Sequence, residues 1–395
     1  MASPAAGYVL TLADDLLAEI LIRLPTLADI GRACASCAAF RRVIAGHAFL
    51  RRLHALHPPS LLGFHTFSGG FQPAESPNPS APAARAIAGA ADFSFSFLPA
   101  RGFWRVRDAR DGRFLLDCDE RKNETFTTIA VCDPLFRRYV LLPPIPHDLA
   151  AAVHQPHRVS GDRKCDIFLA PCGEGESAES FRVIWMAQCS TKLVAFVFSA
   201  AKRQWRAIAS PSWRDLNPEM PSMTEHRSLS CRNYAYGRFY WLLSNFPTRS
   251  KLLVLDMGMM EFSVNPASGD RLKEFAIVEL QESRLGMFAS DSIEGSRLKL
   301  FGANGQNHGE EATEWALQKK VSLSPSYRYY MIGVVGGQLL MQRTPNVGDA
   351  PEFGCISLDF ETLQIQWLRG MIKSGYRPLP AMYTGYPPSL SLPTV

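Results

Sequence analysis

The 395-residue sequence contains no apolar run long enough to span a bilayer and no block of like charges. A membrane-spanning helix needs about 20 mostly apolar residues, and a nucleic-acid-binding protein usually carries a basic patch or stripe. Here 42 basic residues stand against 37 acidic ones, which leaves a formal net charge of only +5. These absences predict that neither a membrane nor a nucleic acid is a partner of this chain.

Cysteines are scattered along the chain, and their number, nine, is odd. This distribution does not form the framework of a small disulfide-bonded scaffold and is typical of free thiols in a reducing compartment. The first ten residues lack the basic region and apolar run of a secretory signal. We therefore expect a cytoplasmic or nuclear location, where the sequon at Asn123 would stay unused.

Familiar catalytic and cofactor motifs are also missing: no Walker loop, GxSxG elbow, HExxH helix or dinucleotide fingerprint occurs. Cys34, Cys37, His54 and His57 superficially offer four zinc ligands. The stretch between them looks helical and lacks the hairpin of a small zinc module, so the cysteines are better interpreted as small apolar residues. We expect no catalytic residue, no metal and no cofactor.

Several short helices are predicted in the first 57 residues. The tetrapeptide TLAD occurs at 11–14 and again at 26–29, and each copy places Thr at a possible N-cap with Asp three residues later. Pro25 should end the first helix. The apolar stripe of that helix, widened by Leu16, contains Leu17, Ile20, Leu21 and Leu24.

A third helix could start at Ser36, and a fourth is predicted over 47–57, ahead of two prolines. Helices this short cannot form a self-sufficient core. Either they pack on the rest of the chain, as amphipathic N-terminal helices usually do, or another protein covers them.

The order of residues in this segment resembles an F-box. The matching residues are Leu12, Asp15, Leu16, Leu17, Glu19, Ile20, Leu21, Arg23, Leu24, Pro25, Ile30, Cys37, Phe40, Arg41 and Ile44. The sequence departs from the family at two positions, since Ala13 stands where Pro is usual and Phe40 where Trp is usual.

The resemblance implies docking onto a Skp-type adaptor, and through it onto a cullin scaffold and a RING subunit. Ala13 lacks the conformational restraint of proline but keeps the helix start, and Phe40 keeps an aromatic side chain at its position. The residues expected to face the adaptor are Leu12, Leu16, Leu17, Ile20, Leu21, Leu24, Pro25 and Ile30.

From Phe93 onward, short runs of β-branched and aromatic residues alternate with Gly, Pro, Asn and Asp, which predicts strands. The stretch before it is rich in Pro, Ala, Gly and Ser and lacks apolar periodicity, which favours a mobile loop or linker. We therefore predict an α plus all-β protein with a helical module over 8–57, a linker over 58–92 and a β domain over 93–395.

The β domain contains a faint repeat. Gly-led strands begin at Gly112, Gly237 and Gly337, and second strands end in a polar residue at Asp133, Ser199, Asp256 and Asp359. That polar side chain should cap a turn, and an aromatic residue after it should open an outer strand and pack between repeats.

A repeat of about 50 residues with about four strands is typical of a kelch-like β-propeller. Five blades can be traced, and a sixth could be closed by residues 61–67 together with 381–386. A β-sandwich with coincidental spacing is the alternative.

This half resembles the propeller-like F-box-associated domains of large plant F-box families, most clearly in IAVCDPLFRRYVLLPPIP (129–146). The combined resemblance implies a non-catalytic substrate receptor of an SCF-type ubiquitin ligase, which binds an unknown target protein through the propeller. Loop residues proposed to contact the target are Trp213, Arg214, Phe246, Arg249, Tyr327 and Tyr329. The alternatives are a propeller that binds a small molecule or glycan, with the helices as a cap, and, more weakly, an enzyme.

Overall fold

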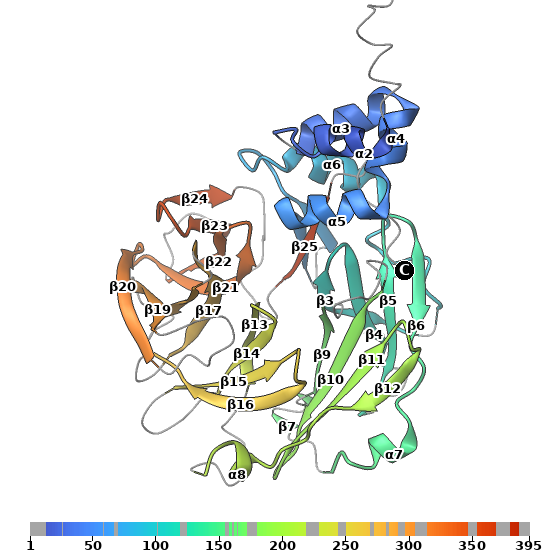
Figure 1. Cartoon of the computed structure of the whole chain (residues 1–395). Helices are drawn as coiled ribbons and strands as arrows, with labels where there is room; N and C mark the ends of the chain where they lie inside the picture. The colour runs from blue at the N-terminus through green and yellow to red at the C-terminus, as the bar shows by residue number, and fades with distance from the viewer. Residues whose placement is uncertain are drawn as a thin grey trace, which may run out of the picture.

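Six antiparallel sheets follow one another around a ring in the computed structural model, and they form a six-bladed β-propeller (Figure 1). Five sheets have four strands and the sixth has three. The structure describes residues 13–25, 27–57, 59–66, 70–100, 102–118, 125–154, 158–159, 162–163, 165–171, 180–218, 229–243, 250–268, 272–281, 284–290, 297–304, 314–346, 354–368 and 380–386. The predicted propeller is confirmed, and it has six blades, the larger of the two predicted numbers.

The four-stranded blades follow the chain from the innermost strand to the outermost. Blade 2 contains β3 (Trp104–Arg110), β4 (Arg113–Cys118), β5 (Thr128–Asp133) and β6 (Arg138–Leu141). Blade 3 contains β9 (Cys165–Ala170), β10 (Arg182–Gln188), β11 (Leu193–Ser199) and β12 (Gln204–Ala207). Blade 4 contains β13 (Leu229–Ala235), β14 (Arg238–Leu243), β15 (Lys251–Asp256) and β16 (Glu261–Pro266).

Blade 5 contains β17 (Glu274–Glu279), β18 (Leu285–Ser290), β19 (Arg297–Asn304) and β20 (Glu314–Ser322). Blade 6 contains β21 (Tyr327–Val335), β22 (Gln338–Pro345), β23 (Gly354–Asp359) and β24 (Ile365–Leu368). Short elements lie in the connections of blades 2 to 4: α7 (His147–Ala150), β7 (Arg158–Val159), β8 (Asp162–Arg163) and α8 (Trp213–Leu216).

Blade 1 closes the ring with strands from both ends of the chain. The C-terminal strand β25 (Ala381–Gly385) is innermost and pairs antiparallel with β1 (Ser60–Thr66), which pairs in turn with β2 (Gly70–Pro73). These are the segments from which the sequence predicted a sixth blade. Because β1 finds its partner more than 300 residues away, no local signal specifies this pairing.

The stretch 58–92, for which we predicted a mobile linker, is folded instead. It contains β1, β2 and a helix, α6 (Ala81–Ala90), which buries Ala81, Ala84 and Ile87. A proline in the first turn and a run of alanines favour this helix, because proline fits the helix start and alanine has the highest helix propensity. The buried side chains of α6 are mostly small, so the segment has only a weak apolar periodicity, and the sequence did not predict this helix.

Blades 2, 4 and 6 share the same inner hairpin. Their turns are Asp111–Gly112, Tyr236–Gly237 and Gly336–Gly337, and all six residues have positive φ, the geometry of a type I′ turn. Each hairpin also has a β-bulge at the same distance from the turn, at Arg107, before Asn233 and at Ile332. The Gly-led motif in the sequence therefore marks every second blade.

The turn after the third strand is capped as predicted. Asp256 accepts hydrogen bonds from the backbone N–H groups of Gly258 and Met259, and Asp133 and Asp359 do the same two and three residues later. Ser199 accepts one long bond of 3.4 Å from the Lys202 N–H. In all four turns the fourth residue after the cap has positive φ: Arg137, Arg203, Met260 and Leu363.

The core consists of apolar layers between neighbouring blades, one at each of the six junctions. Side chains of a central strand alternate between two layers: Trp185 of β10 faces blade 2, whereas Ile184 and Met186 face blade 4. Because both faces of these central strands are buried, their sequences are continuous apolar runs. On the outer strand β12, Trp205 donates its indole N–H to the Pro143 carbonyl (2.8 Å), which confirms an aromatic residue between blades there.

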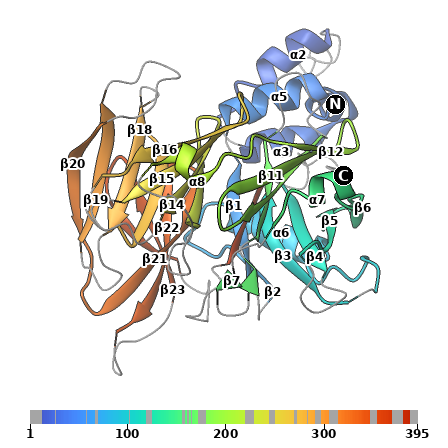
Figure 2. The same cartoon turned by 90° about the horizontal axis from the view of Figure 1, so that it is seen from below.

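Four helices lie outside the ring next to blade 1 (Figures 1 and 2), and Figure 2 shows α2 at the outer edge of the molecule. They are α2 (Asp14–Leu21), α3 (Leu27–Ser36), α4 (Ala38–Ile44) and α5 (His47–Leu56). The predicted helix ends need correction, because Ala13 rather than Thr11 is the N-cap of α2, and α2 ends before Pro25. Cys37 rather than Ser36 caps α4, with its Sγ accepting the Phe40 N–H (3.4 Å).

Replacing a capping carboxylate should weaken the blade turns. In Asp359→Ala, the N–H groups of Glu361 and Thr362 and the Thr362 hydroxyl lose their acceptor, and we expect a loss of about 1–2 kcal/mol in the free energy of unfolding. Urea unfolding measures this loss. The matched variant Ser199→Ala should lose less, because only one long bond is removed; equal losses would contradict the capping role.

Protonation of His65 should destabilise the protein in mild acid. Its ring packs near Phe95 and Phe114, and burial lowers its pKa below the ordinary value despite a backbone hydrogen bond with Phe93. The unfolded chain therefore takes up a proton that the native state resists, and stability is lost as the pH falls below about 6.5.

The melting temperature should accordingly fall less between about pH 7.5 and about pH 5.5 in His65→Phe than in the wild type. His147→Phe, at an exposed position on α7, is the matched control and should keep the wild-type pH dependence. An identical pH profile for His65→Phe and the wild type would sink the prediction.

Candidate functional site

The four N-terminal helices have a core of their own. Ten buried residues form it: Leu17, Leu21, Ile22, Ile30, Cys34, Val43, Ile44, Phe49, Leu50 and Leu53. Tyr386, just after β25, packs against this helical core and donates its hydroxyl to the His57 carbonyl (2.9 Å). The helices therefore need no second protein to fill their interior, and they are joined to blade 1.

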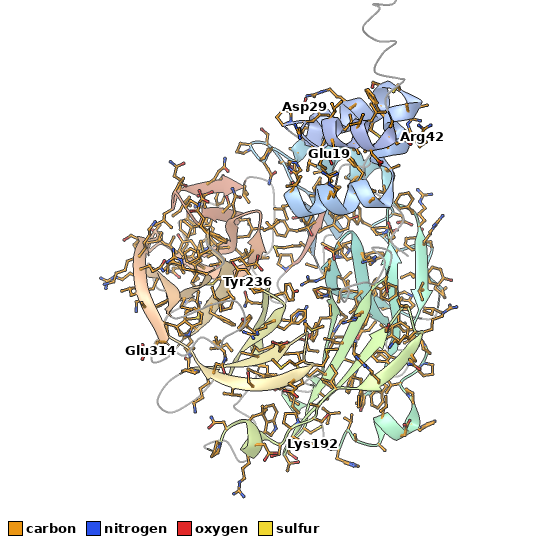
Figure 3. The ribbon with its side chains drawn as sticks, viewed as in Figure 1. Glu19, Asp29, Arg42, Lys192, Tyr236 and Glu314 are labelled. Carbon is orange, nitrogen blue, oxygen red and sulfur yellow. The ribbon has the colours of Figure 1, made fainter. Side chains whose placement is uncertain are left out.

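One flank of α2 is left outside this core. Leu16 and Ile20 lie one helical turn apart, and their side chains are 55% and 54% exposed. Ion pairs join both sides of the helix to its neighbours, from Asp14 to Arg42 (2.7 Å) and from Glu19 to Arg52 (2.6 Å); Figure 3 labels Glu19 and Arg42 on these helices. The result is a small apolar surface held in a fixed orientation, which we call the α2 face.

The predicted adaptor-facing residues divide into two groups. Leu17, Leu21 and Ile30 are buried in the helical core, and Leu24 is partly packed against it. Only Leu16, Ile20 and Pro25 are exposed, and Leu12 lies outside the described residues. The apolar residues that we assigned to one adaptor-facing surface therefore lie on two sides of α2. Leu17 and Leu21 face the helical core, and Leu16 and Ile20 form the α2 face.

Burial argues against three of the residues predicted to contact a target. Trp213 is fully buried and donates its indole N–H to the Cys189 carbonyl (2.8 Å), while Tyr327 and Tyr329 are each 8% exposed in the layer between blades 5 and 6. These three aromatic side chains fill the apolar layers between blades, where burial of their large rings stabilises the fold. Arg214 is exposed on α8, and Phe246 and Arg249 lie outside the described residues.

The sequence reading missed a central cavity of about 1550 Å³. All six innermost strands contribute to its lining, and its charged residues include Arg105, Arg107, Arg110 and Arg232. The segment WRVRDAR that forms β3 is too polar to be recognised as a buried strand. Charged residues that alternate in a short segment before a Gly-led strand are the signal that could have indicated it.

An ion-pair network crosses the cavity wall between blades 2, 3 and 4. Arg232 contacts both carboxylate oxygens of Asp166 (2.7 and 2.9 Å) and one of Asp108 (2.9 Å), and its guanidinium lies 4.5 Å from the ring centre of Phe168. The second Asp108 oxygen accepts the Leu169 N–H (2.8 Å). Burial by itself would raise the pKa of Asp166, but Arg232 holds that pKa below its ordinary value.

Within the described part of the chain, no group of three or more His, Cys, Asp and Glu side chains could hold a metal ion. In the same residues, no helix has the length and apolar character needed to cross a membrane.

Comparisons with known proteins place the chain in no family: no protein-family model and no curated protein matches it. Among solved structures it is similar to the β-propeller domain of the Trilobed protease from Pyrococcus furiosus (9% identity, TM-score 0.36), covering 69% of this chain and 72% of that one. It is also similar to the NanB sialidase from Streptococcus pneumoniae (10% identity, TM-score 0.40), covering 65% of this chain and 40% of that one. A further similar structure is the SapL1 lectin in complex with alpha methyl fucoside (9% identity, TM-score 0.39), covering 81% of this chain and 97% of that one.

The chain spans less than half of the sialidase. Likenesses this distant carry no argument about activity, and the six-bladed fold follows from the strand pairing itself.

Removing Arg232 should destabilise the propeller. Arg232→Met leaves Asp166 and Asp108 without their cation in a mostly buried wall, and we expect a loss of about 2–4 kcal/mol in urea unfolding, since these side chains keep some contact with solvent. Adding Asp166→Asn should recover part of it, because one uncompensated charge is then gone. A loss of only about 0.5 kcal/mol, as for an ordinary surface substitution, would contradict this role.

Proposed function

We propose that this chain is the substrate-receptor subunit of an SCF-type cullin-RING ubiquitin ligase. The helices bind a Skp-type adaptor, and the propeller holds a target protein. The chain performs no bond chemistry itself and accelerates ubiquitin transfer by holding the target near the conjugating enzyme. The observation that carries this proposal is the α2 face, formed by Leu16 and Ile20.

Two features of the α2 face support adaptor binding. It is apolar and exposed although the helical core beneath it is already filled, so its burial requires a partner. It also lies on a helix at the outer edge of the molecule in Figure 2, where an adaptor could approach without meeting the blades. Both residues belong to the ordered set through which the segment resembles an F-box.

The residues expected to face the adaptor differ in their accessibility. Leu17, Leu21 and Ile30 support the helix from inside, so substituting them would unfold the helical core rather than test the interface. Leu16, Ile20 and Pro25 are the residues available to a partner. A test of adaptor binding should therefore change only Leu16 and Ile20, the two of these exposed residues that lie in α2.

The double variant Leu16→Asp with Ile20→Asp should lose binding to a purified Skp-type adaptor by about tenfold or more, because two charges would be buried against an apolar partner. Isothermal titration with the full chain measures the affinity, and circular dichroism checks that the helices remain folded. Met259→Asp, at a blade-4 turn where the side chain is 67% exposed, is the matched control and should bind like the wild type.

Two results would refute the receptor role. One is a wild-type chain that does not bind the adaptor, and the other is a double variant that binds it as tightly as the wild type does.

A further inference from the structure

The arginines that line the central cavity differ in how their charge is balanced. Arg232 is paired with Asp108 and Asp166. Arg105 and Arg107 both lie beside Asp117, at 3.3 and 3.9 Å, and Arg107 also donates to the Cys165 carbonyl (3.0 Å). The charge of Arg105 is therefore matched inside blade 2, whereas Arg107 and Arg232 also tie neighbouring blades together.

Arg110 is the exception. It is the last residue of β3, and its guanidinium reaches across to blade 4, where it lies 4.5 Å from the ring centre of Tyr234 and 5.7 Å from that of Phe239. Among the described residues, no carboxylate lies within ion-pair distance of it and no acceptor within hydrogen-bond distance. A contact with aromatic rings engages the charge of the guanidinium and gives its N–H donors no acceptor of their own among the described residues.

The surroundings of Arg110 form one mouth of the cavity. The hairpin tips of blades 2 and 6 line it, together with Tyr234 and Phe239 on either side of the blade-4 tip, and Figure 3 places Tyr236 near the centre of the ring. An added Cβ at Gly336 or Gly337 would meet no atom within 4 Å, so no neighbouring group packs against the blade-6 tip. A planar cation held by two aromatic rings at an open mouth is preorganised for a carboxylate, which matches its paired donors.

We propose that this mouth binds an extended peptide segment of a target protein through one acidic side chain, whose carboxylate pairs with Arg110. The inference rests on the proposed receptor function and names the class of target. A cavity of about 1550 Å³ exceeds the size of ordinary small-molecule pockets, about 300–1,000 Å³, and suits a peptide better.

Two acids at the same mouth restrict the sequence of that peptide. Glu279 accepts the Tyr236 N–H (2.8 Å), and Asp111 is exposed at its hairpin tip. Both would repel a run of acidic residues. The preferred segment therefore has a single Asp or Glu with neutral or basic residues beside it, rather than a polyacidic tract.

Overlay of the full chain on arrayed 12-residue peptides tests this recognition. The flanking positions are randomised and the central residue is Glu, Gln or Lys. We expect wild type to bind the Glu set at least about fivefold more strongly than the Gln set, and the Lys set least. A set with three consecutive central Glu residues should bind no better than the single-Glu set.

The variant Arg110→Met should lose the preference for Glu over Gln, whereas Arg214→Met, an exposed arginine on α8, should keep it. If Arg110→Met does not fold, Arg110→Lys provides the test, because it keeps the charge and loses the paired donors; its preference should fall. A wild type without a Glu preference, or substituted chains at position 110 that retain it in full, would overturn the proposal.

Adaptor binding measured on the same variants separates the two proposals. Arg110 variants should bind the adaptor normally, since they leave the α2 face intact. A chain that prefers Glu peptides but does not bind the adaptor would refute the receptor role and leave the peptide site standing.

Discussion

The pairing of β25 with β1 is the constraint on which the rest of the structure depends. It closes the ring between the two ends of the chain, so that every blade has a neighbour on both sides. The same short strand reaches two other parts of the molecule. Thr384 accepts the N–H of Gly112 at the tip of the blade-2 hairpin, and Tyr386, just beyond the strand, is hydrogen-bonded to the last turn of α5.

This closure also links the two candidate sites. The α2 face belongs to the helices that Tyr386 contacts, and the mouth that contains Arg110 belongs to the hairpin that Thr384 contacts. Both are therefore held against one seven-residue segment, 380–386. Under the receptor role proposed above, such a link would fix the direction in which a bound target faces relative to the adaptor.

The sequence predicted local features that recur from blade to blade. Asp133, Asp256 and Asp359 revealed the capped turns because an Asx turn needs only residues two and three positions later. The glycines at 112, 237 and 337 revealed inner hairpins because a type I′ turn demands positive φ. The sequence did not show that these hairpins belong to alternate blades, since that depends on which strands pair. Trp213 was misjudged because its indole partner, the Cys189 carbonyl, is brought to it only by the fold.

The sequence alone therefore indicated the apolar strands, the capped turns, the four-stranded repeat and the N-terminal amphipathic helices, because each depends on neighbours a few residues apart. It did not indicate α6 or the polar strand β3. Only the tertiary structure decided which apolar residues remain exposed and which charges remain unbalanced. Leu16 and Leu17 are adjacent and chemically identical, yet one is exposed and the other is buried, because the position of α4 and α5 selects the inner face of α2. Arg110 and Arg232 likewise differ only in what the neighbouring blades place beside them.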